Sequence, residues 1–518
     1  MRAMLPVLSA KAVRELDRRA EALGVPALLL MESAGRGAAE EIRRWLLDLQ
    51  GRRILAVAGK GGNGGDALCA LRFLGLWGAE VRAVVLGEPM GPAATEYQAF
   101  SASFPGRVQV IGDENDLPHL EEALRWAEVV LDGILGVGVE GEVRGLPRAA
   151  IERLQDFAGV VIAIDLPSGL CADHGRILGP AVRAHLTLAM GALKPCHLLP
   201  PAAELCGEVR VVEVAYPPRA WEEVNPEAHV LSQDFCASLL PKRPRFGHKG
   251  TFGRVLVVAG SVGMAGAAAL CAEGALRAGA GLVHVFVPEP IFPVVAGLVP
   301  EALVHPGRAD AEGTFAPEAA EEALRWAQGM DVVVAGPGLG RTPGAAEVVR
   351  ALLTENLPKL VLDADALFAL AQDPKLLRKK HGELVLTPHP GEFSRLVGVP
   401  TEEVVPEKIR WAREKAKEWK SVVVLKGPPT AVADPAGRVF LNTTGNTALA
   451  HGGSGDVLAG LIAGLWAGGL APWEAAALAV FAHGRAAEVL TLDHSARAVL
   501  PSDLFAALSQ VFLSLERH

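Results

Sequence analysis

The strongest constraint on the fold is a regular alternation between short apolar runs, rich in β-branched residues, and longer Ala- and Leu-rich stretches with helical character. Runs such as 53–58, 129–132 and 160–165 are almost wholly apolar, and they end close to a Gly or an Asp. Parallel strands have this pattern because helices cover both faces of their sheet. The alternation therefore predicts an α/β fold.

The alternation occurs twice along the chain. It stops over residues 216–228, where three prolines and several charges predict a linker, and it resumes with a strand at 254–259. A chain of 518 residues is also too long for one ordinary core. We expect two three-layer α/β/α domains, covering residues 1–220 and 229–518. Further strands of the second domain are predicted at 283–287, 331–335, 359–363, 383–387 and 421–425, before a helical final part.

Composition narrows the class of protein. The formal net charge is −9 and no long basic run is present, which argues against nucleic-acid binding through a basic face. The six cysteines are scattered without a CxxC pair, so neither a zinc site nor a redox motif is indicated. The first residues do not resemble a signal peptide, and no apolar stretch is long and uncharged enough for a membrane span. We expect a cytoplasmic enzyme with neither a membrane nor a nucleic-acid partner.

In the first half, three loops at 59–66, 131–138 and 165–173 follow predicted strands. Five glycines in the first loop allow its backbone to approach a ligand closely and to expose N–H donors. Asp132 and Asp165 each stand where a strand ends. Either acid alone is explained as well by turn formation. Because three such loops converge on one edge of a parallel sheet, together they favour a ligand site.

These loops, with LLMESAG at 29–35, resemble the NAD(P)H-hydrate epimerase family. The shared motifs are Gly-Asn-Gly-Gly-Asp at 62–66, LDGILGVG at 131–138 and IDLPSG at 164–169. The resemblance covers residues 1–220. It implies a Rossmann-like sandwich that interconverts the R and S forms of hydrated NADH or NADPH at C6 of the nicotinamide ring.

The same resemblance implies roles for single residues. Asn63, Asp132 and Ser168 would hold a potassium ion, since an all-oxygen set suits a hard cation. Asp165 would contact the substrate, and its carboxylate is the expected proton-transfer group. The dinucleotide would be held by Gly62, Asn63, Gly64, Gly65 and Asp66 of the first loop and by Gly136, Val137 and Gly138 of the second. Gly62 and Val137 stand where the family usually has Asn and Thr.

The second half contains the Gly-rich turn Gly452-Gly453-Ser454-Gly455-Asp456, directly before an apolar helical segment. Backbone N–H groups and the dipole at such a helix start form an anion site, in which an acidic side chain would repel a phosphate. Two interpretations of Asp456 stay open. It is a helix N-cap, or it is a base that takes a proton from a hydroxyl while the turn stabilises a phosphoryl group.

Other motifs of the second half follow predicted strands in a fixed order. Each Gly/Pro turn alone is ordinary, and a lone His389 or Lys426 is more often structural. As a set, the motifs resemble the ADP-dependent NAD(P)H-hydrate dehydratase family, which has a ribokinase-like fold, over residues 229–518. The order of the two halves resembles bifunctional bacterial NAD(P)H-hydrate repair enzymes. The motifs are HKG at 248–250, AGSVGMAGAA at 259–268, AGPGLG at 335–340, LDADAL at 362–367, LTPHPGE at 386–392 and LKGPPT at 425–430.

This second resemblance implies that ADP phosphorylates the hydroxyl at C6 of the S hydrate, and that elimination of phosphate restores NAD(P)H and leaves AMP. Asp456 would be the base. Mg²⁺ is expected on the nucleotide phosphates, without an unambiguous protein ligand. A homo-oligomer is also expected. The adenine nucleotide would be bound by Lys426, Gly427, Pro428, Pro429, Thr430 and Gly455, and the hydrate by Ala267, Gly340, His389 and Asp456.

Two alternatives remain at this point. The second half fits a small-metabolite kinase of the ribokinase class that uses ATP and a hydroxymethyl substrate. The first half fits a binding module without catalysis, although the joint presence of Asn63, Asp132, Asp165 and Ser168 favours an enzyme.

Overall fold

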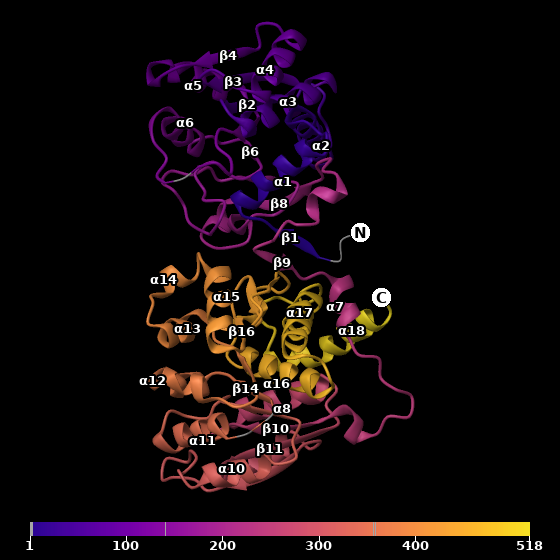
Figure 1. Cartoon of the computed structure of the whole chain (residues 1–518), viewed down its shortest axis with the longest axis vertical. Helices are drawn as coiled ribbons and strands as arrows, with labels where there is room; N and C mark the ends of the chain where they lie inside the picture. The colour runs from indigo at the N-terminus through magenta and orange to yellow at the C-terminus, as the bar shows by residue number, and fades with distance from the viewer. Residues whose placement is uncertain (1–3, 140, 356, 358) are drawn as a thin grey trace. The chain divides into compact units, whose positions relative to one another are not determined.

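A computed structural model describes residues 4–139, 141–355, 357 and 359–518 of the chain (Figure 1). The chain forms two compact units. The N-terminal unit comprises Leu5–Glu227 together with Val405–Glu407, and the C-terminal unit comprises Ala228–Val404 and Lys408–His518. Both units are α/β sandwiches, as the alternation predicted.

The main sheet of the N-terminal unit is parallel throughout, in the order β4-β3-β2-β5-β6-β7-β8. The chain passes from β2 outward to β4 and then returns to β5 on the other side of β2. The carboxyl ends of β2 and β5 therefore flank the crevice in which such sheets bind ligands. The three strands predicted in this half are confirmed as β2, β5 and β6. The strands are β2 (Arg53–Gly59), β3 (Glu80–Leu86), β4 (Val108–Ile111), β5 (Val129–Gly133), β6 (Val160–Ile164), β7 (Leu186–Met190) and β8 (Glu208–Val212).

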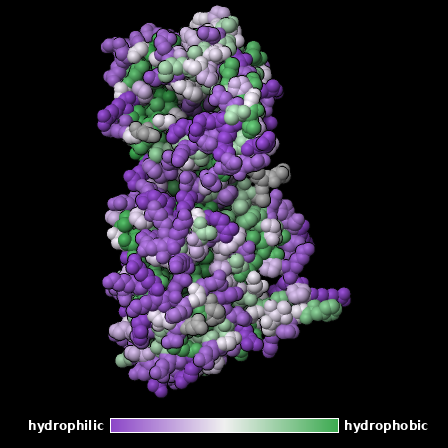
Figure 2. Space-filling model, in the orientation of Figure 1, coloured by the Kyte–Doolittle hydropathy of each residue, from purple (hydrophilic) through white to green (hydrophobic). Residues whose placement is uncertain are grey.

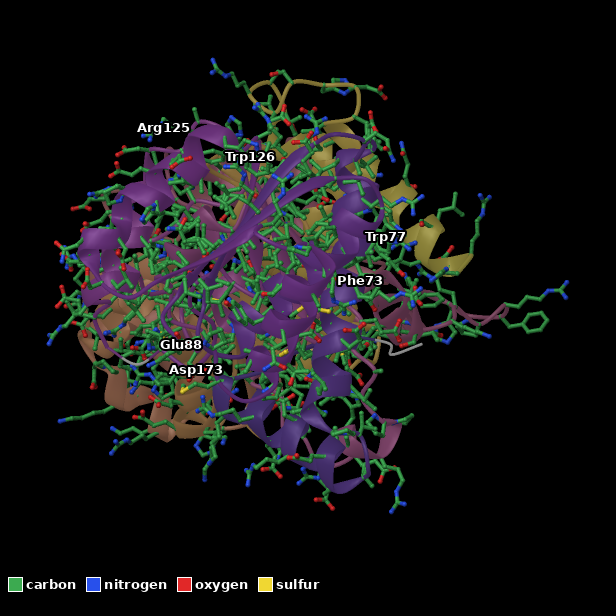
Figure 3. The ribbon with its side chains drawn as sticks, turned by 90° about the horizontal axis from the view of Figure 1, so that it is seen from above. Phe73, Trp77, Glu88, Arg125, Trp126 and Asp173 are labelled. Carbon is green, nitrogen blue, oxygen red and sulfur yellow. The ribbon has the colours of Figure 1, made fainter. Side chains whose placement is uncertain are left out.

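Helices cover both faces of this sheet. Alternate residues of β2 point to opposite sides, so that Ile54 packs in one core and Leu55 in the other. Phe73 and Trp77 at the end of α3 lie with their ring centroids 5.7 Å apart (Figure 3).

A short strand, β1 (Leu5–Val7), forms an isolated parallel bridge from Val7 to Leu193. The helices are α1 (Ala10–Ala22), α2 (Ala27–Leu46), α3 (Gly62–Leu76) and α4 (Pro92–Ser103) on one side and α5 (Leu117–Trp126) and α6 (Gly145–Gln155) on the other.

Helix α3 begins at Gly62, so most of the segment 59–66, which was predicted to be a glycine-rich loop, belongs to the first turns of the helix. Gly64 allows this start. A Cβ atom on Gly64 would lie 1.9 Å from the carbonyl oxygen of Gly59, at the end of β2. Because Gly64 has no side chain, the first turn of α3 can pack directly against the end of β2.

The stretch 216–228, predicted as a linker, is mostly packed on the N-terminal unit. A 3₁₀ turn over Pro218–Trp221 buries Ala220 completely, and Tyr216 meets Trp221 edge to face with ring centroids 5.7 Å apart. Prolines and charges correctly indicated the absence of a long helix or strand. They gave no sign of the two aromatic side chains that anchor the segment.

The sheet of the C-terminal unit has the order β9-β18-β17-β16-β15-β14-β13-β10-β11-β12. Its strands from β10 to β16 are parallel, and β16, β17 and β18 form antiparallel pairs. The six strands predicted in this half are confirmed, each within about a residue at either end. The strands are β9 (Ala228–Val230), β10 (Arg254–Val258), β11 (Leu282–Pro288), β12 (Leu303–Gly307), β13 (Val332–Ala335), β14 (Lys359–Leu362), β15 (Glu383–Leu386), β16 (Val422–Leu425), β17 (Thr430–Ala433) and β18 (Val439–Asn442).

On one face of this sheet, α16 packs closely on α8 in the main core of the unit. Gly460 and Gly464, one turn apart on α16, permit the contact. A Cβ atom on Gly460 would lie 2.0 Å from the carbonyl oxygen of Cys271 on α8. The helices are α7 (Gln233–Leu239), α8 (Ala265–Arg277), α9 (Phe292–Leu298), α10 (Ala319–Ala327), α11 (Pro343–Thr354), α12 (Asp365–Gln372), α13 (Pro390–Val397), α14 (Thr401–Val404), α15 (Lys408–Trp419), α16 (Ser454–Ala467), α17 (Pro472–Leu490) and α18 (Leu504–Glu516).

The visible surface of the chain is mainly hydrophilic, with smaller hydrophobic areas between (Figure 2). Among the described residues, no helix has both the length and the apolar character needed to cross a membrane. All six cysteines are free thiols, and only Cys171 is more than slightly exposed.

Candidate active sites

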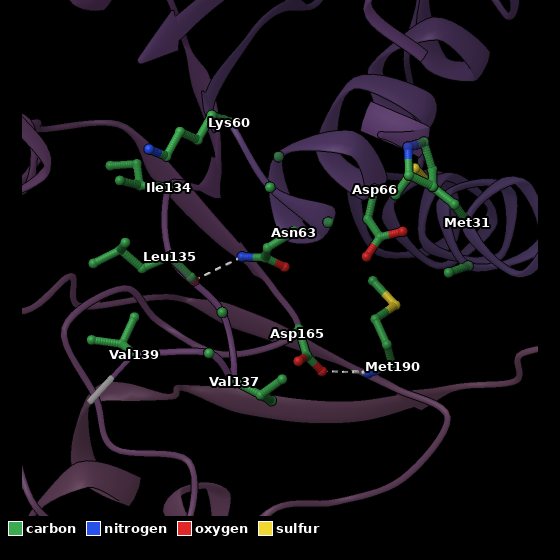
Figure 4. A pocket seen from close by; sticks show the side chains of 18 of the residues that line it. Met31, Lys60, Asn63, Asp66, Ile134, Leu135, Val137, Val139, Asp165 and Met190 are labelled. Atoms are coloured by element: carbon green, nitrogen blue, oxygen red, sulfur yellow. Dashed lines mark hydrogen bonds between the residues drawn. The ribbon is translucent and has the colours of Figure 1, made fainter. Parts of the chain in front are cut away.

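The N-terminal unit contains a pocket of about 730 Å³ at the carboxyl ends of β2, β5 and β6 (Figure 4). It lies at the crevice that the strand order predicts. Figure 4 shows Asn63, Asp66 and Asp165 around the same space. The pocket is lined by Gly62, Asn63, Gly64, Asp66, Gly136, Val137, Gly138 and Asp165 of the predicted set, and also by Asp17, Lys194 and Tyr216. Gly65 does not line the pocket; a Cβ atom on it would lie 2.5 Å from the sulfur of Met31, which does line it.

Asp132 and Ser168, two of the predicted potassium ligands, are in direct contact and fully buried. Asp132 Oδ1 accepts a hydrogen bond from Ser168 Oγ at 2.6 Å, and Asp132 Oδ2 accepts one from Ser168 N at 2.7 Å. Burial raises the pKa of Asp132 to about 6, although the hydrogen bonds from Ser168 oppose the increase. The backbone N–H of Leu135 in turn donates to Ser168 Oγ at 2.9 Å.

Asn63, the third predicted ligand, is bound to the same loop. Its Nδ2 donates to the carbonyl oxygen of Leu135 at 2.8 Å. Among the described residues, its buried Oδ1 has no hydrogen-bond partner. A buried amide oxygen without a donor is unfavourable, and a cation would satisfy it. A carboxylate also has lone pairs beyond those that Ser168 uses. The donor set therefore fits a potassium ion.

Asp165 is held by a buried network. Its backbone has a φ of +65°, a left-handed conformation that is uncommon for residues other than glycine. Its Oδ1 accepts hydrogen bonds from Lys194 Nζ and, at 3.0 Å, from Met190 N. Lys194 is fully buried, and its Nζ also donates to the carbonyl oxygen of Met190 at 2.9 Å. The network fixes the direction of the Asp165 carboxylate at the pocket wall.

His197 supports this network through the backbone. Its Nδ1 accepts a hydrogen bond from Lys194 N at 3.0 Å, and its Nε2 lies 2.8 Å from the carbonyl oxygen of Asp165. Burial lowers the pKa of His197 to about 4, so the ring is neutral near pH 7. With Nδ1 as acceptor, Nε2 carries the proton and donates to Asp165.

Two further carboxyl groups line the pocket. Burial raises the pKa of Asp66 well above its usual value, and the charges of Asp165 and Asp17 add to this increase. Burial also raises the pKa of Asp17, whose Oδ1 accepts a hydrogen bond from the Tyr216 hydroxyl at 2.7 Å. Asp17, Tyr216 and Lys194 were not predicted from sequence, because none lies in a glycine-rich motif.

The C-terminal unit places a buried ion pair at the carboxyl edge of its sheet. Asp363, directly after β14, accepts hydrogen bonds at Oδ1 from Lys426 Nζ and from Thr387 Oγ1, both at 2.7 Å. Asp363 is only 1 % exposed. Thr387 and Lys426 follow the next two strands, β15 and β16. The pair therefore joins three neighbouring strand ends, and Asp363 and Thr387 were not among the predicted site residues.

The amino end of α16 lies against this ion pair. A Cβ atom on Gly455 would lie 3.3 Å from Lys426 Nζ and 3.7 Å from Asp363 Oδ2. Gly453, with a φ of +99°, is the N-cap residue, and Asp456 lies within the first turn of the helix. The interpretation of Asp456 as an N-cap is therefore wrong.

Asp456 has a strongly perturbed acidity. Burial raises its pKa to about 7, the charge of Asp363 adds to the increase, and Lys426 opposes it. Ser454, at the start of the same helix, lies with its Oγ 3.2 Å from Nε2 of the buried His483. Burial lowers the pKa of His483 to about 4. The helix start thus combines the backbone amides of a first helical turn with a carboxyl group whose pKa is about 7.

The predicted hydrate-binding residues of this unit lie on neighbouring loops. Gly340 N donates to Asp365 Oδ2 at 3.0 Å. A Cβ atom on Gly338, in the same loop, would lie 2.9 Å from the Cβ of Ala267. His389 is the N-cap of α13, where its Nδ1 accepts a hydrogen bond from Gly391 N at 3.0 Å. His389 has a structural role, whether or not it contacts a ligand.

The loop 426–429 joins β16 to β17 and contains Lys426, Gly427, Pro428 and Pro429 of the predicted nucleotide site; Thr430 begins β17. Its start is fixed by a hydrogen bond from Lys426 N to the carbonyl oxygen of Pro388 at 2.9 Å. Glu392, on α13, has its pKa raised to about 6 by burial, which the charge of Lys426 opposes. The structure therefore gathers Lys426, Asp363, Gly455 and Asp456 at one point.

Both halves of this chain match families of known proteins. The model of the NAD(P)H-hydrate dehydratase family matches residues 255–510, and that of the YjeF-related protein N-terminus matches residues 27–196. The bifunctional NAD(P)H-hydrate repair enzyme Nnr of Moorella thermoacetica is 38% identical to this chain, over 99% of this chain and 97% of that protein. The Nnr enzyme of Escherichia coli K12 is 33% identical, over 96% and 92%.

Among solved structures, the ADP/ATP-dependent NAD(P)H-hydrate dehydratase of Bacillus subtilis, co-crystallized with ATP/Mg²⁺, is 36% identical to the aligned part of this chain. The alignment covers 55% of this chain and 98% of that one, with a TM-score of 0.49.

Proposed function

Since this chain belongs to the family of bifunctional NAD(P)H-hydrate repair enzymes, we propose that it restores hydrated NADH and NADPH in two steps. The N-terminal unit interconverts the R and S hydrates. The C-terminal unit dehydrates the S hydrate with ADP. A cytoplasmic location and a homo-oligomer remain predictions from sequence.

Dehydration begins with transfer of a phosphoryl group. Asp456, in its ionised form, takes the proton from the C6 hydroxyl of the hydrate, and the hydroxyl oxygen attacks the terminal phosphorus of ADP. The bond between that phosphorus and the bridging oxygen breaks, and AMP leaves. Elimination then breaks the bond from C6 to the phosphorylated oxygen, and the departing phosphate takes a proton from the neighbouring ring carbon, so that the dihydronicotinamide is restored.

The observation that carries this proposal is the position of Asp456 in the first turn of α16, against the Asp363–Lys426 pair. The N–H groups at the helix start and the Lys426 ammonium suit a moving phosphoryl group. A carboxyl group with a pKa of about 7 is also a suitable base near neutral pH.

Epimerisation requires that C6 lose and regain its configuration. Asp165 removes the proton of the C6 hydroxyl, and the bond from C6 to the ring nitrogen breaks to leave an aldehyde. Asp66, whose pKa burial raises well above its usual value, supplies a proton toward the ring nitrogen. Attack by the nitrogen on the other face of the aldehyde closes the ring, and both protons return.

Two metal ions belong to this proposal. Potassium would be held by Asn63, Asp132 and Ser168, and its charge would favour the oxygen-rich conformation of the loop at Leu135. Asp363 and Glu392, two carboxylates close to Lys426, fit Mg²⁺, which prefers such ligands together with substrate phosphates. Mg²⁺ supplies charge neutralisation on the phosphates of the nucleotide.

A kinase of the ribokinase class is the competing function for the C-terminal unit. The test is to supply purified S hydrate of NADH with either ADP or ATP, and to follow the absorbance of the reduced nicotinamide ring together with AMP and phosphate. We expect one AMP and one phosphate for each NADH formed with ADP. Accumulation of a phosphorylated hydrate without NADH would support the kinase instead.

A further inference from the structure

Lys408, the first residue of α15, is almost completely buried, being 1 % exposed. It stands outside every motif that the sequence analysis selected. Lysine is among the residues least often buried completely, unless its charge is paired or hydrogen-bonded.

The ammonium of Lys408 donates to three backbone carbonyl groups of a single loop. Nζ lies 3.2 Å from the oxygen of Lys426, 3.0 Å from that of Gly427 and 2.9 Å from that of Pro429. An ammonium has three N–H donors, and the loop 426–429 accepts all of them. No side-chain carboxylate is needed to account for these three bonds.

Burial of the Lys408 ammonium removes its hydration, and the carbonyl groups of the loop must compensate for that loss. Burial lowers the pKa of Lys408 to about 7, because a charge out of water is unfavourable. Carbonyl dipoles directed at the ammonium compensate for the lost hydration. Conversely, without Lys408 the buried carbonyl of Pro429 and the partly buried carbonyls of Lys426 and Gly427 would lose a donor, which is unfavourable, so the loop and the lysine depend on each other.

The geometry also determines what the loop presents on its other side. A trans peptide group points its N–H opposite to its C=O. With the Lys426 carbonyl directed at Lys408, the N–H of Gly427 points away from it. Gly427 adopts a φ of +95°, which suits glycine, and a Cβ atom there would lie 3.4 Å from Lys408 Nζ. The N–H of Gly427, fixed in this way, suits an anionic ligand; Pro428 and Pro429 have no N–H.

We propose that Lys408 is a positioning residue for the adenine nucleotide: its buried ammonium holds the loop 426–429 in the conformation that binds ADP and keeps Lys426 beside Asp363. The inference rests on the proposed nucleotide site. It adds a residue that would not touch the nucleotide and would act only through the loop.

The test compares Lys408→Met, which has a similar length but no donor, with Lys408→Arg, which keeps the charge. Lys417→Met, on the exposed face of the same helix, is the matched control. With full-length proteins, the measurements are ADP binding by calorimetry in the presence of Mg²⁺, and the KM for ADP and for the S hydrate. The unfolding midpoint checks the folding of the C-terminal unit, and the rate of R/S interconversion checks the N-terminal unit.

Lys408→Met is expected to raise the Kd and KM for ADP by about tenfold or more, since hydrogen bonds from a charged group are lost. The KM for the hydrate and the R/S exchange should stay within about twofold. Lys408→Arg should recover part of the ADP affinity, and Lys417→Met should match the wild type.

Unchanged ADP affinity in Lys408→Met would overturn the role of Lys408, as would an equal rise of both KM values. If Lys408→Met does not fold, Lys408→Arg decides, because an arginine cannot reproduce the three bonds of an ammonium. A raised KM for ADP with an unchanged unfolding midpoint supports the role, and an unchanged KM refutes it. If the wild-type protein neither binds nor uses ADP, the proposed function fails instead.

Discussion

The two sites use the same pair of residue types in different ways. In the N-terminal unit, Lys194 is paired directly with Asp165, the predicted proton-transfer group. In the C-terminal unit, Lys426 is paired with Asp363, and the predicted base Asp456 has its pKa raised to about 7 by burial and by Asp363. The position of the lysine therefore determines which carboxylate is held in place and which one is free to titrate near neutral pH.

The groups around the two sites also differ, and each set suits a different kind of transfer. The N-terminal pocket collects carboxyl groups from α1, α3 and the end of β6, which suits movement of protons on one bound molecule. The C-terminal site adds the amino end of α16, whose N–H groups suit a phosphate. We therefore expect substitutions to separate the two activities cleanly.

The largest separation is expected from Asp456→Asn. Without the base, ADP-dependent formation of NADH should fall by about 10²–10⁴-fold, while R/S interconversion stays unchanged. Chromatographic separation of the two hydrates together with an NADH assay measures both activities. Asp493→Asn, at an exposed aspartate of the same unit, should behave as wild type. Near-normal dehydration in Asp456→Asn would show that another group is the base.

Asp165→Asn is expected to have the reverse effect. R/S exchange should fall by about 100-fold, and dehydration of pure S hydrate should persist. Asparagine tolerates the left-handed backbone of this position, so the variant tests the carboxylate separately from the conformation. Exposed Asp156→Asn is the control. The assignment is wrong if exchange continues at the wild-type rate.

Potassium provides a third test of the comparison. Replacing potassium by tetramethylammonium should slow R/S exchange by about tenfold or more, and Asn63→Ala should raise the potassium concentration needed for half-maximal exchange. Dehydration should change little, because all three predicted potassium ligands lie in the N-terminal unit. Exposed Asn115→Ala is the control. Exchange that does not depend on potassium would remove Asn63, Asp132 and Ser168 from an ion site.

The smallest expected effect is a shift of the pH profile of dehydration. Asp456 must lose its proton to act as a base, so the rate of dehydration should rise about tenfold per pH unit below pH 7 and level off above it. Asp363→Asn removes the like charge and frees Lys426, which should move this limb to lower pH. A rate that is flat between about pH 5 and pH 8 would indicate a base with the usual acidity of aspartate.

Much of the fold could be predicted from the sequence, because strands buried on both faces leave continuous apolar runs. The strand ends, and with them Asp132, Asp165 and the loop at Lys426, could be located from the same pattern. The start of α3 could not be located from the sequence, because a glycine-rich segment is compatible both with a loop and with a first helical turn. Only the close contact between Gly64 and Gly59 in the structure decides between them.

The partners of the predicted residues were harder to find. Lys194 is 29 positions from Asp165, and Tyr216 is 199 positions from Asp17. Buried lysines such as Lys408 look in the sequence like any exposed lysine of a helix. Only the tertiary contacts distinguish them, because a charge is costly to bury unless specific groups surround it.

The most direct test of the central claim is a crystal structure of the full-length protein with ADP and Mg²⁺. We predict that the terminal phosphate lies at the first turn of α16, next to the Asp456 carboxylate and Lys426 Nζ, with the loop 426–429 at the nucleotide. A terminal phosphate bound elsewhere, out of reach of Asp456, would contradict the account.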